Sequence, residues 1–267
     1  MKFQFKIIVS LLFLILVAQP LAAQKSGETI KILSYNIYHG ENPVNAGEGN
    51  IEQIAALIRE FQPDLVALQE VDSMTIRTAR VYGSKVDLVQ KLAELTGYLG
   101  YFAKAMDYAE GGYGEGILAK GNGLFETQNL PLPAGGEPRA AAWVTYTLPK
   151  GKEIAFAGTH LCHQFEENRI AQVAAVSQRA ENQKLPTVWV GDLNFRPESN
   201  AYKSIKGPWK DAGALPTPYA PTYGSLENGA RIDYVWFDSS KFTLLDYKVL
   251  NVPHSDHYPV LVTLQLK

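Results

Sequence analysis

The chain has 267 residues, of which 46% are hydrophobic and 19% are charged, a composition typical of a globular protein with a packed core. Its net charge of −2 excludes a general basic surface for nucleic acid, although it leaves room for a local basic patch. Cys162 is the only cysteine, so an intramolecular disulfide is excluded and stability has to come from the core.

The first residues are typical of a secretory signal peptide. Lys2 and Lys6 precede an apolar run over 7–17, and small residues follow up to position 23. The apolar run is too short to span the roughly 30 Å of membrane hydrocarbon comfortably, so a retained anchor is the weaker interpretation. We therefore expect a signal peptide over 1–23 and one domain over 28–267. The mature chain should be a monomer without a transmembrane anchor, exported to the periplasm or the cell exterior.

The first half of the chain alternates predicted strands and helices. One helix is expected over 51–61, with Asn50 and Gln53 forming a capping box at its start. A second helix is expected to begin at Ser84 and to end at Gly97. The predicted strands cover 29–35, 64–68 and several short stretches between 98 and 148, with a hairpin turn at 121–123.

The second half carries one long predicted helix, over 166–182, and several more strands. These strands are predicted over 141–148, 153–158, 186–190, 231–236, 242–250 and 258–266. Residues 198–228 are rich in loops and aromatic side chains. Two packed sheets with helices on their outer faces would bury all of these apolar segments.

Many of these strands are followed by a polar side chain that packing of the strand does not require. These side chains are Asn36, Glu70, His160, Asp192, Asn194, Asp233, Asp256 and His257. Ligand sites in such architectures form outside strand ends, so these side chains could converge on one cleft. Asp192 and Asn194 are two positions apart, a spacing that places two side chains on the same side of an extended segment.

The chemistry of this set favours a metal-dependent hydrolase. Carboxylate and amide oxygens suit a hard cation such as Mg²⁺, Mn²⁺ or Ca²⁺, and not zinc. Two histidines with nearby acids suit proton transfer and charge stabilisation on a phosphate. Structural roles are the alternative: Asp192 and Asn194 could cap their own turn, and Asp233 could pair with Arg231.

Six short motifs, in this order, resemble the endonuclease/exonuclease/phosphatase superfamily. They are Asn36 after a strand, 68–72 (LQEVD), 158–161 (GTHL), 191–194 (GDLN), 232–234 (IDY) and 255–259 (SDHYP). The resemblance spans about residues 30–266. It implies an α/β fold, a four-layer α/β/β/α sandwich in which helices flank two packed mixed β-sheets. It also implies metal-dependent attack of water on phosphorus.

Matched motif by motif, the resemblance also assigns roles. It implies metal binding by Glu70, Asn36 and Asp256. It implies catalytic roles for His160, Asp192, Asn194, Asp233 and His257. Substrate contacts are expected from Asn36, Arg77, Asn194 and His160. Within this set, Asp233 would pair with His257 or position the water, and Asp192 would orient or deprotonate that water.

Several further residues near the motifs are candidates. Glu115 lies where an acid could orient His160, and His39 could contact the metal or the substrate. Tyr38 occupies the position where some repair nucleases of this superfamily carry a second acid, which argues against a two-metal arrangement that relies on it. Further basic candidates for a substrate phosphate are Arg80 and Arg139.

Three alternatives for the function stay open: a nuclease, a hydrolase of small-molecule or lipid phosphoesters, and a binding module. A nuclease needs a basic surface that tracks phosphates, and this chain is mildly acidic. A small-molecule or lipid phosphoester is therefore ranked ahead of nucleic acid, and the aromatic residues of 201–223 could serve lipid contact. A binding module without catalysis is the third alternative, although every expected catalytic position is filled.

Overall fold

The computed structural model of the protein describes residues 27–215 and 219–267. The signal peptide expected over 1–23 lies outside the described residues. No helix within these two ranges is long and apolar enough to cross a membrane.

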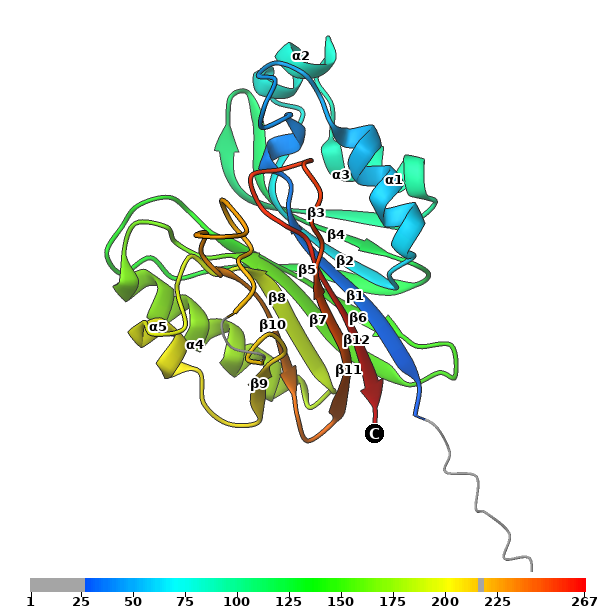
Figure 1. Ribbon diagram of the computed structural model, residues 1–267, viewed down its shortest axis with the longest axis vertical. Coiled ribbons are helices and arrows are strands. Elements are labelled where there is room, and N and C mark those ends of the chain that lie inside the picture. Colours follow the sequence, from blue (N-terminus) through cyan, green and yellow to red (C-terminus); the bar gives the residue numbers. More distant parts are fainter. Residues whose placement is uncertain (1–26, 216–218) are drawn as a thin grey trace, which may run out of the picture.

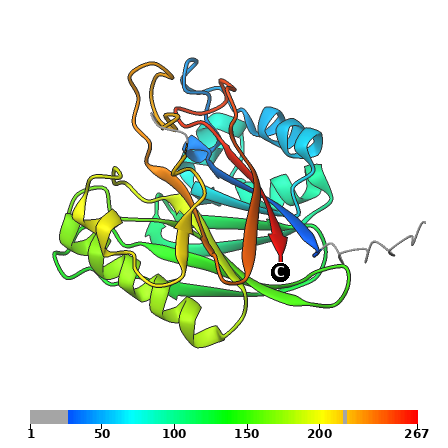
Figure 2. The same cartoon turned by 60° about the horizontal axis from the view of Figure 1, so that its bottom comes forward.

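Two six-stranded sheets pack face to face, and helices cover their outer faces, which confirms the predicted sandwich (Figures 1 and 2). The first sheet has the order β11-β12-β1-β2-β4-β3 and the second the order β5-β6-β7-β8-β10-β9. The strands of the first sheet are β1 (Thr29–Asn36), β2 (Leu65–Ser73), β3 (Leu99–Tyr108), β4 (Gly111–Ala119), β11 (Phe242–Val249) and β12 (Val260–Leu266). Those of the second sheet are β5 (Gly123–Asn129), β6 (Ala140–Thr147), β7 (Glu153–His160), β8 (Thr187–Asp192), β9 (Trp209–Asp211) and β10 (Asp233–Asp238).

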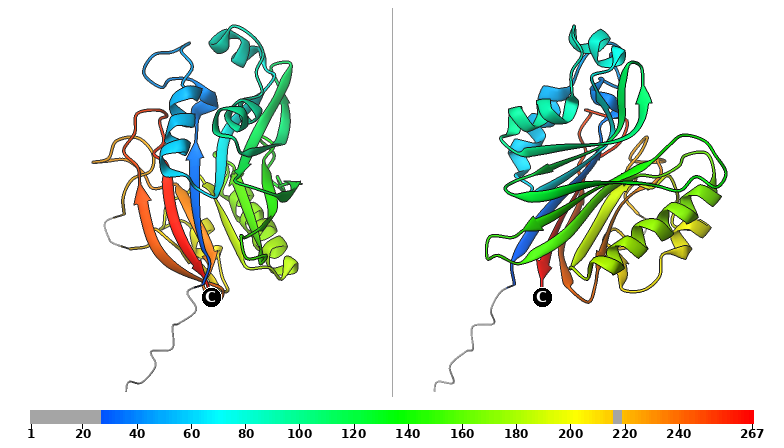
Figure 3. Two further views of the ribbon diagram at one scale, coloured as in Figure 1. Left: turned by 90° about the vertical axis from the view of Figure 1, so that its right-hand side faces the viewer. Right: turned by 180° about the vertical axis from the view of Figure 1, so that it is seen from behind.

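The helices divide between the two outer faces. They are η1 (Tyr38–Gly40), α1 (Ile51–Phe61), α2 (Ile76–Tyr82), α3 (Leu88–Thr96), α4 (Glu166–Gln183) and α5 (Asn200–Ser204). The apolar sides of α1 and α3 pack on the first sheet, and those of α4 and α5 pack on the second (Figure 3).

Alternation along the strands produces the layers. In β1, Ile30 and Ile32 face the opposite sheet, while Leu33 and Tyr35 face α1 and α3. The two sheets approach each other closely at Gly158, where a Cβ atom would lie 2.6 Å from the Cβ of Ala67. A larger residue at this position would therefore push the sheets apart.

The cap prediction for α1 is wrong although its bounds are right. Asn50 precedes the helix, but its side chain makes no cap hydrogen bond within the described structure. Its amide nitrogen donates instead to the backbone carbonyls of Glu41 and His254. Asn50 thus ties the start of α1 to the loop before β12.

The segment after β2 also differs from the prediction. Asp87, and not Ser84, caps α3, because its Oδ1 accepts from the backbone N of Gln90 at 2.9 Å. An additional helix, α2, begins after Thr75, whose side chain accepts from the backbone N of Thr78. Gly97 ends α3 in a left-handed conformation, as predicted.

Candidate active site

The eight polar residues predicted to converge do form one cluster, at the end of the sandwich where β1, β7 and β8 finish. Asn36 ends β1, His160 ends β7 and Asp192 ends β8, while Asp233 begins the antiparallel β10. The loop before β12 lies at the same end of the molecule (Figure 1), and its Asp256 and His257 line the same cleft as His160 and Asp192. The cleft has a volume of about 380 Å³ and is lined by Glu70, Tyr113, Glu137, Arg139, His160, His163, Asp192, Asn194, Tyr223, Ile232, Asp256 and His257.

Asn36 is the hub of this cluster. Its fully buried amide nitrogen lies 3.1 Å from Glu70 Oε1, 3.2 Å from Asp192 Oδ2 and 3.4 Å from His257 Nε2. Its amide oxygen accepts from the backbone N of Tyr38 at 3.2 Å and retains a second lone pair. One side chain therefore links β1, β2, β8 and the loop before β12.

Glu70 reaches the cleft because β2 is irregular at this point. The register of β2 against β4 shifts between Leu68 and Val71, and Glu70 has a positive φ of 56°. Such bulges redirect a side chain out of the ladder. Burial opposes ionisation of Glu70, but the neighbouring His39 and Asn36 and the nearby imidazoles lower its pKa. A carboxylate is thus held at the cleft.

His39 lies beside Glu70, in η1. Its Nδ1 is 3.7 Å from Glu70 Oε2, and its Nε2 is 3.3 Å from Glu41 Oε2. The structure therefore brings His39 close to the expected metal side of the cleft.

His257 and Asp233 form a buried pair, with Nδ1 of the imidazole 2.9 Å from Oδ2 of the carboxylate. Burial would lower the pKa of His257, but the charges of Asp233 and Asp192 outweigh this effect and raise it to about 10. The two acids therefore favour the protonated form of the His257 imidazole. Its Nε2, 3.5 Å from Asp192 Oδ2, is the nitrogen left to donate elsewhere.

Asp192 is a buried carboxyl group at the end of β8. Burial raises its pKa to about 7, against the opposing influence of His257. The residue before it, Gly191, has a φ of 145°, and a Cβ atom there would lie 1.8 Å from the carbonyl oxygen of Thr159. Only glycine fits this approach of β8 to β7.

The segment from Asp192 to Asn194 is a turn and not an extended strand. Asn194 has a φ of 51°, and its backbone N donates to Asp192 Oδ1 at 3.0 Å. The turn therefore caps its own backbone, as the structural alternative expected, yet both side chains still line the cleft. The side-chain nitrogen of Asn194 lies 2.8 Å from His160 Nε2.

His160 also lines the cleft. Its Nε2 lies 3.4 Å from Asp192 Oδ2, and burial together with the charge of Arg139 holds its pKa well below the ordinary value. Glu115, the acid expected to orient His160, is fully buried, and neither of its carboxylate oxygens has a hydrogen-bond partner among the described residues. The group that contacts His160 Nδ1 is Arg139.

Arg77 is not brought into the cleft. Its guanidinium pairs with Asp72, with Nε 2.8 Å from Oδ2 and Nη2 2.5 Å from Oδ1, and it stacks on the ring of Tyr108. Arg80 is exposed on α2. The structure therefore offers Arg139, and neither of these two, as the cleft arginine.

Sequence reasoning missed two aromatic residues at this site. Tyr113 lines the cleft from β4, where strand alternation places it on the same face as Glu115. Tyr223 packs against His257 with ring centroids 4.8 Å apart, although the sequence marks it only as an aromatic loop residue. The alternation in β4 was a usable signal, whereas no local pattern identifies Tyr223.

The donor set fits a hard divalent cation. Asp192, Asp233 and His257 form a buried group whose ligand atoms lie within 4.8 Å of one another, so they could hold a metal ion. Glu70 Oε2 accepts no hydrogen bond in the described structure, and Asp256 Oδ1 accepts only from Ser255 Oγ, at 3.3 Å. Oxygen donors with free lone pairs are the ligands that Mg²⁺ and Mn²⁺ prefer.

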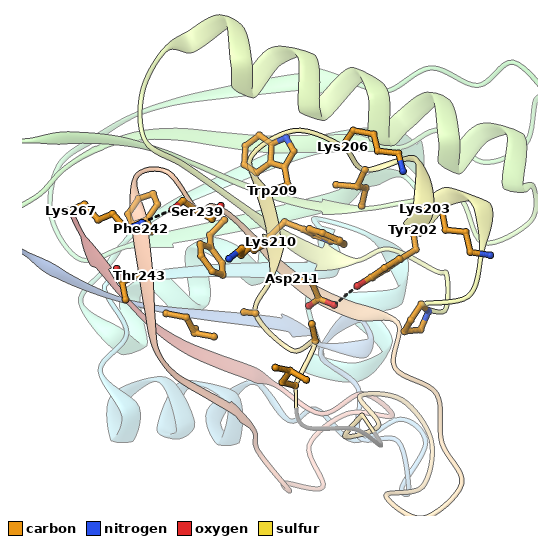
Figure 4. Close-up of a pocket in the computed structure, with 18 residues that line it drawn as sticks. Tyr202, Lys203, Lys206, Trp209, Lys210, Asp211, Ser239, Phe242, Thr243 and Lys267 are labelled. Carbon is orange, nitrogen blue, oxygen red and sulfur yellow. Dashed lines mark hydrogen bonds between the residues drawn. The ribbon is translucent and has the colours of Figure 1, made fainter.

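A larger cavity, of about 750 Å³, lies elsewhere, between α5, β9 and β11 (Figure 4). Its polar side chains include Lys203, Lys206 and Lys210, and Asp211 is the single acid among its described lining residues. Arg231 pairs with Asp211 through both of its terminal nitrogens, Nη1 and Nη2. This cavity lacks the combination of acids, amides and imidazoles found in the smaller cleft, which is therefore the candidate active site.

A phosphoester hydrolase needs a base for water, donors for the phosphoryl oxygens and ligands for a hard cation. The cleft supplies a candidate for each, so the fold and the site define an enzyme of this class. The chain matches the Endonuclease/Exonuclease/phosphatase family over residues 33–257 and belongs to it, which confirms the resemblance seen in the motifs.

Solved structures share the fold at low sequence identity. A family member from Bacteroides thetaiotaomicron is 19% identical, with a TM-score of 0.71 and coverage of 90% of this chain and 99% of that one. A mannosyl-6-phosphatase of the same species is 19% identical, with a TM-score of 0.69 and coverage of 88% and 99%. The catalytic domain of human nocturnin, with bound sulfate, is 23% identical, with a TM-score of 0.68 and coverage of 90% and 94%. No curated protein sequence matches the chain.

Proposed function

We propose that the protein is an exported, divalent-metal-dependent hydrolase that directs water onto the phosphorus of a small-molecule or lipid phosphoester. The observation that carries this proposal is the contact of one buried amide, that of Asn36, with Glu70, Asp192 and His257. These three groups come from separate parts of the chain and together supply a metal ligand, a base and a proton donor.

The cation would be held by Glu70 and Asp256, with the oxygen of Asn36 beside them, and would polarise a phosphoryl oxygen. Asp233 and His257 already bond to each other, so the geometry favours keeping them as a pair and not as metal ligands.

The chain's own residues would carry the proton steps. Asp192, with a pKa of about 7, accepts a proton from the attacking water. His257 donates a proton from Nε2 to the leaving ester oxygen as its bond to phosphorus breaks, while Asp233 holds Nδ1 of the imidazole. Asn194 and His160 hold the non-bridging oxygens on which negative charge accumulates.

Cleft size supports a small substrate. A volume of about 380 Å³ has room for a phosphate with one sugar-sized group. The net charge of −2 also disfavours a polyanion as the substrate. The structural neighbour named as a mannosyl-6-phosphatase is consistent with this class.

Hydrolysis of chromogenic phosphodiesters and phosphomonoesters with Mg²⁺ or Mn²⁺ tests the chemistry. Asp192→Ala and His257→Ala should each lower kcat by at least roughly 10²–10³-fold, the typical effect of removing a group that stabilises the transition state. Asp107→Ala is the matched control, because this side chain is 89% exposed and, among the described residues, pairs only with Lys104. Wild-type rates in either cleft variant, or full activity in excess chelator, would refute the proposal.

Export rests on the first 23 residues and is tested separately. The full chain, expressed in a bacterial host, should be recovered outside the cytoplasm with an N-terminus near residue 24. Replacing Lys2 and Lys6 by Glu should leave uncleaved chain inside the cell. Uncleaved wild-type protein in the cytoplasm would contradict export without affecting the proposed chemistry.

A further inference from the structure

Arg139 lies at the wall of the cleft and faces two histidines. It immediately precedes β6, and the pairing of Ala141 with Thr159 places it at the same end of the sheet as His160. Its Nη1 lies 3.1 Å from His160 Nδ1, and its Nη2 lies 3.0 Å from His163 Nδ1. Arg139 is only 3% exposed, so this arrangement is built into the interior.

The contact fixes the proton on His160. A guanidinium has five donors and no acceptor, so the ring nitrogen facing it must be the unprotonated one. A neutral imidazole has a single N–H, which is therefore placed on Nε2. This proton points toward Asp192 Oδ2, at 3.4 Å. The Asn194 side-chain nitrogen lies 2.8 Å from Nε2 and donates to the carbonyl of Leu161 at 3.1 Å, so in this tautomer the amide turns its oxygen toward Nε2 and gives up the Leu161 contact.

An acidic partner would have the opposite effect. A carboxylate beside Nδ1 accepts a proton from that nitrogen and favours the doubly protonated ring. Glu115 was the acid expected there, but its carboxyl oxygens contact no donor among the described residues, and burial raises its pKa well above the ordinary value. The charge of Arg139 is balanced instead by Glu137, whose Oε1 is 3.1 Å from Nη1.

We propose that Arg139 is a positioning residue of this enzyme: it holds His160 in the tautomer that carries its proton on Nε2. His160 then presents a donor, and not a lone pair, to a non-bridging oxygen of the substrate phosphate. The inference rests on the proposed function only for the identity of that phosphate. The tautomer itself is a property of the free protein.

Nitrogen NMR of the histidine rings tests the tautomer without any activity measurement. In protein labelled with ¹⁵N-histidine, the His160 ring, assigned by its loss in His160→Asn, should show an unprotonated Nδ1 and a protonated Nε2. Arg139→Met should abolish this preference, and Arg139→Lys, which keeps one donor group, should retain part of it. A protonated Nδ1 in the wild type, or an unchanged spectrum in Arg139→Met, would overturn the proposal.

Kinetics on a chromogenic phosphoester provide the second measurement. Losing a partner that orients a site residue typically costs about 10- to 100-fold, so Arg139→Met should lower kcat by that factor with little change in KM. Glu115→Gln is the matched control, because it preserves the shape of a neighbouring buried side chain whose carboxyl oxygens contact no donor among the described residues. It should keep kcat within about twofold of wild type.

Two results would assign Arg139 a purely structural role. One is an equal fall in kcat in Arg139→Met and Glu115→Gln. The other is a fall in Arg139→Met that appears as a smaller fraction of folded protein at unchanged turnover per folded molecule. If the NMR result holds while no phosphoester is hydrolysed, the positioning inference stands and the proposed function fails.

Discussion

Replacing Asn36 by Asp tests whether the buried amide of Asn36 stabilises the neighbouring carboxylates of Glu70 and Asp192 by donating to both. The change preserves shape but turns the donating nitrogen into an oxygen. That oxygen would lie 3.1 Å from Glu70 Oε1 and 3.2 Å from Asp192 Oδ2. Two attractive contacts would become repulsive.

The cost can be worked from these distances. At an effective dielectric constant of about 20, two like charges roughly 3.2 Å apart repel by about 5 kcal/mol. The new carboxyl would avoid this repulsion by staying protonated. Holding an acid of ordinary pKa of about 3.9 in its protonated form at pH 7 costs about 4 kcal/mol, which caps the loss of stability. For a domain of this size, that loss corresponds to a fall in Tm of about 8–16 °C.

Thermal unfolding with and without Mg²⁺ or Mn²⁺ is the assay. A divalent cation neutralises the added carboxylate, so metal should raise the Tm of Asn36→Asp by more than it raises that of the wild type. Asn168→Asp is the control: this amide is also fully buried, but it donates to the carbonyl of Gly135 and to Cys162 Sγ, and to none of the clustered acids. Metal rescue of both variants alike, or an Asn36→Asp protein as stable as wild type without metal, would refute the reasoning.

Three further predictions concern backbone fit and titration. Gly191→Ala should cost about 2–5 kcal/mol from strained φ and overpacking, whereas Gly151→Ala, at positive φ but in open space, should cost only the strain of about 1–3 kcal/mol. Equal losses in urea unfolding would contradict the steric argument. Because Asp192 acts as a base once deprotonated, kcat/KM should rise as pH passes through about 7, with metal moving this limb lower; a flat profile would count against the assignment. Since the folded-state pKa of His257 is raised from about 6.5 to about 10, its pairing stabilises the fold fully below about pH 6.5 and is lost as pH rises through about 10. Asp233→Asn should therefore cost more stability near pH 6 than above pH 10, and a loss independent of pH would exclude this linkage.

Much of the fold could be predicted because apolar periodicity is strong where segments are buried. The strand expected over 29–35 is β1, and the helix expected over 166–182 is α4, each within one residue. Helix α2 was not predicted from the sequence because it buries only Thr78 and therefore has no apolar stripe. The α3 cap was misplaced because Ser84 and Asp87 are both good capping residues, and only the fold decides between them.

The residues of the candidate site also divide into those that the sequence predicts and those that only the fold reveals. Polar residues that directly follow buried strands could be located from the sequence, since the end of an apolar run marks them. Contacts made across strands could not. Arg139 meets His160 only because β6 pairs with β7, a register that no local pattern reveals. Arg77 looked available for a phosphate, yet Asp72, five residues away, occupies its guanidinium.

The pairing of β12 with β1 has a consequence for biogenesis. Asn36 and His257 are separated by 221 positions, and β1 lies between β2 and β12 in the sheet. A ribosome-bound nascent chain that has not yet released β12 cannot assemble the catalytic cluster, however complete its first sheet and helices are otherwise. Such late closure over long sequence separations is also slow. Turnover should therefore appear only after β12 has left the ribosome, and removal of residues 260–267 should abolish it.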